Sequence, residues 1–119
     1  MSQMDIPENE VIALEGASVS VVSDMLAYSV LNRPAIEVNW RRETQANPAL
    51  YNGPVFLSPA VRISGGVLEG AYARADFATL MYWRSDSSHQ RPWHVFGVGV
   101  VVSSDNRLIA ARMAARTAL

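Results

Sequence analysis

The chain has 119 residues, 50% of them hydrophobic and 18% charged, which is the composition of one ordinary globular domain. Its formal net charge of −1 provides no long-range field that would attract nucleic acid, so nucleic acid is not expected as a partner. All basic residues are arginine and no cysteine occurs, so lysine nucleophiles, thiolate chemistry, disulfides and sulfur-based zinc sites are excluded as well.

The same features predict a cytoplasmic protein without a membrane anchor. Residues 1–10 are acidic and polar, lack the basic start and apolar run of a signal peptide, and are expected to be a flexible N-terminus. The longest apolar run, residues 95–102, is too short to cross a bilayer. Residues 11–119 contain no linker or repeat, so we expect a single domain there.

The first predicted elements are apolar segments at residues 11–14 and 17–22. In the second segment, valines alternate with serines, and this period of two is typical of a half-buried strand. The next segment, residues 25–31, fits neither the helical nor the strand period and stays unassigned.

A helix is predicted to begin at Asn32, because asparagine is a good N-cap and Pro34 is tolerated in a first turn. It should end before residues 47–48, since the residue ahead of a proline is pushed out of the helical region. The residues expected to face inward are Ile36, Trp40, and either Val38 or Arg41.

A β-hairpin is predicted from residues 55–63 and 67–74, joined at residues 64–66. The two glycines of that turn supply the positive φ that a tight hairpin needs. Pro59 cannot donate to a sheet ladder, so it should place part of the first strand at an edge or a bulge.

A short helix is expected after Asp76, a plausible N-cap, and should end near Arg84. Residues 85–92 are polar and predict a mobile loop. Residues 95–103 and 107–113 are apolar and flank a polar turn at residues 104–106, which predicts a second antiparallel hairpin. Together these elements indicate an α+β domain with two or three short helices on a mainly antiparallel sheet.

The sequence contains no complete catalytic or metal site. His89 and His94 are the two histidines, and their spacing around Pro92 makes a poor ligand set. Gly97 and Gly99 lie inside a valine run without a following helix, which rules out the dinucleotide-binding fingerprint. We therefore predict no catalytic residues and no metal ligands in this chain.

One cluster is retained as a candidate contact for a ligand or a partner. Tyr82, Trp83 and Arg84 follow one another just before the polar loop. Aromatic rings beside a guanidinium can stack on a ligand or a partner surface, although most aromatic residues in such a chain are expected to be core.

The order of several segments resembles the N-terminal region of Nudix (MutT-like) hydrolases. These segments are Trp40, the run Asn-Pro-Ala-Leu-Tyr-Asn-Gly-Pro at residues 47–54, residues 72–77, and the apolar residues 95–102 followed by residues 107–112. The resemblance covers roughly residues 38–118. It implies the N-terminal subdomain of such an enzyme plus the first hairpin of the Nudix fold.

The glutamate-rich Nudix signature, which holds magnesium, does not occur in these residues. The chain is therefore expected to be either the non-catalytic part of a longer enzyme or a standalone relative that lost catalysis. The resemblance implies a nucleoside diphosphate derivative as substrate and magnesium as cofactor only if a downstream Nudix box exists. A homodimer is expected, and the alternative function is a non-enzymatic binding or interaction module.

Overall fold

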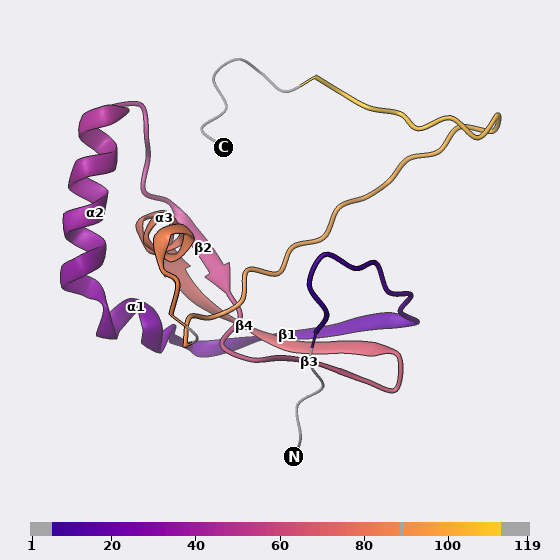
Figure 1. Cartoon of the computed structure of the whole chain (residues 1–119), viewed down its shortest axis with the longest axis horizontal. Helices are drawn as coiled ribbons and strands as arrows, with labels where there is room; N and C mark the ends of the chain where they lie inside the picture. Colours follow the sequence, from indigo (N-terminus) through magenta and orange to yellow (C-terminus); the bar gives the residue numbers. More distant parts are fainter. Residues whose placement is uncertain (1–5, 89, 113–119) are drawn as a thin grey trace.

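The structure, a computed structural model, describes residues 6–88 and 90–112. In this part of the chain, three helices and a four-stranded sheet form an α+β fold (Figure 1), which confirms the predicted class. The elements in chain order are β1 Gly16–Met25, α1 Ala27–Leu31, α2 Arg33–Ala46, β2 Pro54–Leu57, β3 Val61–Ser64, β4 Val67–Asp76 and α3 Phe77–Ser85.

The sheet is mixed, and β4 is its central strand. β1 pairs with β4 in parallel, whereas β2 and β3 both pair with β4 in antiparallel orientation. β2 lies beside the C-terminal half of β4 and β3 beside its N-terminal half, so these two short strands share one edge. Two of the three pairings are thus antiparallel, and the parallel pairing with β1 is a feature that local sequence patterns did not predict.

The central hairpin lies where the sequence predicts it. Gly65 and Gly66 have φ values of +58° and +78°, which close the turn between β3 and β4. The predicted strand over residues 55–63 is divided at Pro59 into β2 and β3, because proline supplies no N–H to the ladder.

The hydrophobic core lies between the helices and the C-terminal half of β4. Ala73 and Ala75 point toward the helices, whereas Arg74 between them is exposed, as the two-residue period of a strand requires. Leu26, Leu57 and Leu80 complete the buried cluster. The helices gather at this end of the sheet, and the other end carries no helical layer in the described chain (Figure 1).

The prediction that β1 is half-buried was wrong, because the helices cover only the other part of the sheet. The strand predicted at residues 17–22 forms and extends over Gly16–Met25, yet it is exposed along its whole length rather than half-buried. No helix lies over it, so its alternating valines have no described layer to pack against. Residues 11–14 form no strand and are exposed.

Helix α2 begins and ends as predicted, with Asn32 and Asn47 as its cap residues, but the Asn32 side chain makes no capping hydrogen bond and donates instead to the Tyr28 carbonyl at 2.9 Å. Its inward face differs in part from the expectation. Ile36 is fully buried, but the next buried position is Asn39, at 5% exposure, whereas Val38 is 58% exposed. The choice of Val38 or Arg41 as an inward residue was therefore wrong, because the three-residue step from Ile36 to Asn39 follows the helix face that meets α3.

The unassigned residues 25–31 contain the change from strand to helix. β1 ends at Met25, the extended residue Leu26 is the cap, and α1 follows immediately. Leu26 is buried, and its N–H donates to the carbonyl oxygen of Arg74 at 2.9 Å. Residues 25–31 fit neither the helical nor the strand period because α1 is a single short helical turn between a strand and a second helix.

Residues 95–112, the last described segment, are called the arm. The arm leaves the body of the molecule, which the sheet and the three helices form (Figure 1). Its turn lies at residues 104–106 as predicted, and Val102 and Leu108 form an antiparallel bridge. The two long strands of the predicted hairpin are not formed: the pairing is confined to the residues next to the turn. Residue 113, the expected end of the hairpin, lies outside the described residues.

Candidate functional site

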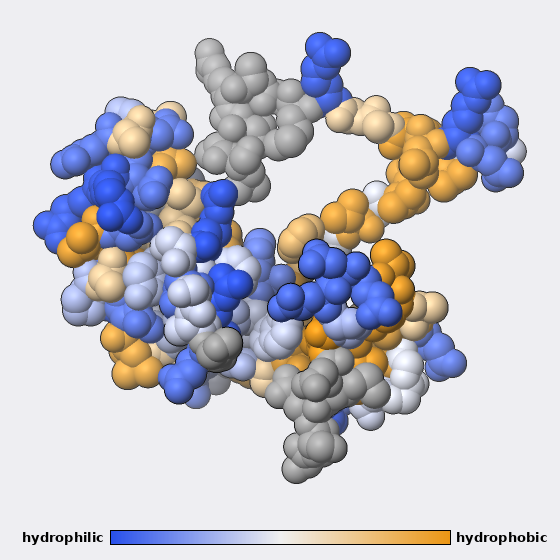
Figure 2. Space-filling view, in the orientation of Figure 1, coloured by the Kyte–Doolittle hydropathy of each residue, from blue (hydrophilic) through white to orange (hydrophobic). Residues whose placement is uncertain are grey.

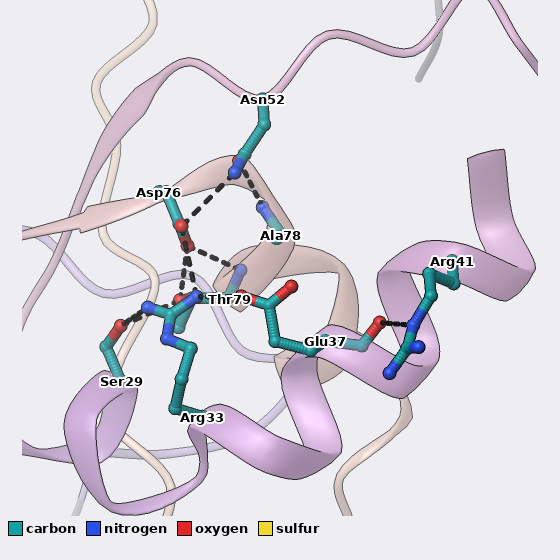
Figure 3. Close-up of polar contacts among 8 residues, drawn as sticks. All are labelled: Ser29, Arg33, Glu37, Arg41, Asn52, Asp76, Ala78 and Thr79. Atoms are coloured by element: carbon teal, nitrogen blue, oxygen red, sulfur yellow. Dashed lines mark hydrogen bonds and ion pairs between the residues drawn. The ribbon is translucent and has the colours of Figure 1, made fainter.

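A partly buried polar network fixes the start of α3. Asp76 accepts hydrogen bonds from the backbone N–H of Thr79 at 2.9 Å and from its hydroxyl at 2.6 Å. Its other carboxylate oxygen accepts from Arg33 and from the side-chain amide of Asn52, both at 3.2 Å (Figure 3). Asp76 is thus the N-cap of α3, as the sequence predicts, and also joins α2 to the loop before β2.

Burial alone would raise the pKa of Asp76, but the opposing interactions outweigh it. Hydrogen bonds from Thr79 and Asn52, together with the charge of Arg33, hold the pKa of this carboxyl below its ordinary value. The carboxylate therefore stays ionised at neutral pH. Because every one of these partners is part of the fold, we assign the network a structural role.

The segment at residues 47–54, which carries much of the family resemblance, contributes to the same network. The N–H of Ala78 donates to the Asn52 side-chain oxygen at 2.9 Å, and the N–H of Phe77 donates to the Gly53 carbonyl at 2.8 Å. These two N–H groups at the start of α3 have no partner within the helix. Asn52 and Gly53 thus act as a second cap, which accounts for the side chain of Asn52 without any ligand.

A cleft of about 430 Å³ lies between α1, the C-terminal end of α3 and the loop that follows it. Leu26, Leu31, Pro59 and Pro92 supply apolar walls. This volume lies within the usual range of small-molecule sites, and a mainly apolar wall with a few polar groups is their usual composition. The cleft is therefore the candidate functional site.

Two tyrosines and one aspartate give the cleft its chemical character. The hydroxyl of Tyr28 donates to Asp86 at 2.6 Å, and the rings of Tyr28 and Tyr82 lie 6.1 Å apart at an angle of 40°. Burial and the hydrogen bond to Asp86 raise the pKa of Tyr28 above its ordinary value. The same hydrogen bond, with others from Ser88, holds the pKa of Asp86 below its ordinary value. At neutral pH the pair is a phenol and a carboxylate.

Trp83 lies beneath the loop rather than in the cleft. Its indole N–H donates to the carbonyl of Pro92 at 2.6 Å. The guanidinium of Arg91 lies 4.3 Å from the ring centroid and donates to the Trp83 carbonyl at 2.9 Å. The His94 ring meets the same indole edge-on at a centroid distance of 5.7 Å. These contacts hold residues 91–94 against α3 and position one wall of the cleft.

The structure separates the three predicted contact residues. Tyr82 lines the cleft, Trp83 supports the loop behind it, and Arg84 is exposed, where it donates to the sulfur of Met81 at 3.8 Å. Tyr28 and Asp86, which sequence reasoning missed, belong to the cleft in addition to Tyr82. Within the described residues, no three side chains of His, Cys, Asp or Glu are grouped to hold a metal ion.

Comparison of the sequence with models of known families and with curated proteins, and of the structure with solved structures, found no match. In the described part of the chain, no helix has both the length and the apolar character needed to span a membrane.

Proposed function

We propose that this chain is the scaffold and recognition portion of a Nudix-type hydrolase that acts on a nucleoside diphosphate derivative, and that it has no turnover by itself. The proposal is supported by the resemblance of residues 38–118 to the N-terminal region of such enzymes.

The observation that carries the proposal is the arm. Its apolar side chains are exposed, namely Phe96, Val98, Val100, Val101, Val102, Leu108 and Ile109. Figure 2 shows them as an apolar stretch that projects from the body and ends in a polar turn. A short two-stranded ribbon is at best marginally stable alone, and an apolar surface of this kind marks an interaction with further structure. The opening hairpin of a larger sheet has this character.

A homodimer is part of the same proposal. The outer edge of β1 has no strand partner in the described residues, and several of its apolar side chains are exposed. Unpaired edges and apolar surface can be covered by a second copy. Light scattering at high micromolar concentration is expected to give a mass of about two chains, and a clean monomer would count against the dimer.

The test of the main proposal compares two proteins. The 119-residue chain is expected to release no nucleoside monophosphate from a panel of nucleoside diphosphate sugars, with or without magnesium. A version extended through a downstream Nudix box should gain magnesium-dependent turnover, since carboxylates converging on the metal would then be available. Replacing the box glutamates with glutamine is the matched control and should abolish the gain. Turnover by the 119-residue chain above a mock preparation would contradict the proposal.

The second candidate function is a binding module without chemistry, and the cleft at Tyr28, Tyr82 and Asp86 favours it. The reading frame after residue 119 distinguishes the two functions. A helix led by glycine and rich in glutamate would support the hydrolase, and its absence would favour the module.

A further inference from the structure

The charge of the cleft comes from one residue. Of the described residues that line it, Asp86 alone carries a formal charge. No arginine among the described residues forms an ion pair with it within 4.0 Å. The cleft therefore presents a single negative charge among apolar and neutral polar walls, which is an environment that attracts a cation.

The hydrogen-bonding capacity of Asp86 is nevertheless largely used. One carboxylate oxygen accepts from the hydroxyls of Tyr28 and Ser88, at 2.6 and 3.1 Å, and the other accepts from the Ser88 N–H at 2.9 Å. A carboxylate has about four acceptor positions, so about one remains.

The neighbouring arginines are committed to other partners. Arg91 stacks on Trp83 and donates to its carbonyl, so its charge only weakly favours ionised Asp86 and does not fill the cleft. Arg33 is held by Asp76 in the structural network. The Arg91 guanidinium lies near Asp86, because it and the Asp86 N–H donate to the same Trp83 carbonyl, but it forms no ion pair with the carboxylate within 4.0 Å.

Two aromatic rings complete the set. Tyr28 and Tyr82 both line the cleft, their ring centroids lie 6.1 Å apart at an angle of 40°, and the Tyr28 hydroxyl is bonded to Asp86. Aromatic faces attract cations, and quaternary ammonium groups are the ligands most often recognised in this way. Such a group has no N–H to place, so it needs only what this cleft offers: charge, aromatic rings and an apolar surface.

We propose that the cleft binds a methylated ammonium group, carried either by a small quaternary amine or by a trimethyl-lysine side chain. Asp86 supplies the counter-charge, Tyr28 and Tyr82 supply the aromatic walls, and Leu26 and Leu31 contact the methyl groups or the attached chain. This inference goes beyond the hydrolase proposal and does not depend on it, because binding is measured without turnover.

The first experiment titrates the 119-residue chain with choline and, in parallel, with 3,3-dimethylbutan-1-ol, the neutral carbon analogue of the same shape. We expect saturable shifts in the NMR signals of the cleft residues with choline, and binding of the neutral analogue that is at least about fivefold weaker, because the cation–π and charge terms are absent. Equal binding of the two compounds would overturn the proposal. The absence of saturable choline binding would overturn it as well, unless the trimethyl-lysine peptide described next binds.

Two histone-like test peptides distinguish the source of the group. A peptide with trimethyl-lysine binding at least about tenfold more tightly than choline would identify a protein side chain as the ligand, since a longer chain buries more surface. Equal or weaker binding would identify a small quaternary amine. A peptide with unmodified lysine is the control, and its binding as tightly as the methylated one would contradict the proposal.

Variants then test the residues. Asp86→Asn keeps the size and an acceptor for Tyr28 but removes the charge, and should weaken binding at least about fivefold. Tyr82→Leu should weaken it similarly, whereas Tyr51→Leu, at an exposed tyrosine that does not line the cleft, should not. Unchanged binding in Asp86→Asn would overturn the proposal even if Tyr82→Leu failed to fold.

Discussion

The body and the arm have similar apolar side chains in opposite surroundings. In the body, Leu57 is 0% exposed and packs in the core formed by β2, β4 and α3. In the arm, Leu108 is 71% exposed and its strand contact is a single bridge to Val102. Apolar patterning therefore indicates that a segment has a face to bury, but not which structure covers that face.

The largest expected effect compares a matched pair of substitutions. Leu57→Ala should lower the free energy of unfolding by about 2–5 kcal/mol, because it removes buried methyl groups and leaves a cavity. Leu108→Ala removes the same atoms from an exposed position and should change it by less than about 0.5 kcal/mol. Urea denaturation followed by tryptophan fluorescence at low micromolar concentration measures both.

Two outcomes would change this comparison. A loss in Leu108→Ala that equals the loss in Leu57→Ala would mean that the arm is packed in solution. If that loss grew with protein concentration, the packing partner would be a second copy, as the proposed homodimer requires.

The second prediction concerns the network that holds the body together. Asp76→Ala removes the N-cap of α3 and leaves Arg33 and Asn52 without their shared acceptor, so it should lower the free energy of unfolding by about 2 kcal/mol. Asp105→Ala in the arm, whose side chain is exposed in its pair with Arg107, is the control and should have almost no effect. Equal losses of unfolding free energy in Asp76→Ala and Asp105→Ala would show that the body and the arm do not differ in this way.

Much of the body was predictable because its signals are local. Asn32 and Asn47 at the ends of α2, Asp76 before α3 and Gly65-Gly66 in the hairpin each act within a few residues of their own position. The parallel pairing of β1 with β4 was not predictable, because α1, α2, β2 and β3 lie between the two strands in the chain and nothing local fixes their register.

The candidate site was predictable only in part, for the same reason. Tyr82 was selected as an aromatic residue before a polar loop, and it lines the cleft. Tyr28 and Asp86 are 58 positions apart, and their hydrogen bond depends on α1 packing against the end of α3. Arg84 was selected because it follows Tyr82 and Trp83 in the sequence. The helix turns its side chain away from the cleft, and Arg84 is exposed.

The third prediction is a pH dependence that belongs to the body. The folded-state pKa of Asp76 is lowered, so its stabilising contribution is fully present above the unfolded value of about 3.9 and is lost as the pH falls through the folded value. The urea midpoint of the wild-type protein should therefore fall as the pH is lowered below about 4. In Asp76→Ala the fall should be smaller, and an identical fall in both proteins would show that other carboxyls cause it.

The smallest expected effect compares the two turns. Gly65 in the body and Asn106 in the arm have almost the same backbone φ, +58° and +62°. A Cβ at Gly65 would meet no atom within 4 Å, so Gly65→Ala tests the conformational penalty alone, about 1 kcal/mol. Asn106→Ala imposes a similar local penalty, but it should leave the urea midpoint unchanged, because the arm contributes no buried side chain to the cooperative unit. If Asn106→Ala shifts the midpoint as far as Gly65→Ala does, the arm unfolds together with the body, and its apolar side chains must then be covered in solution.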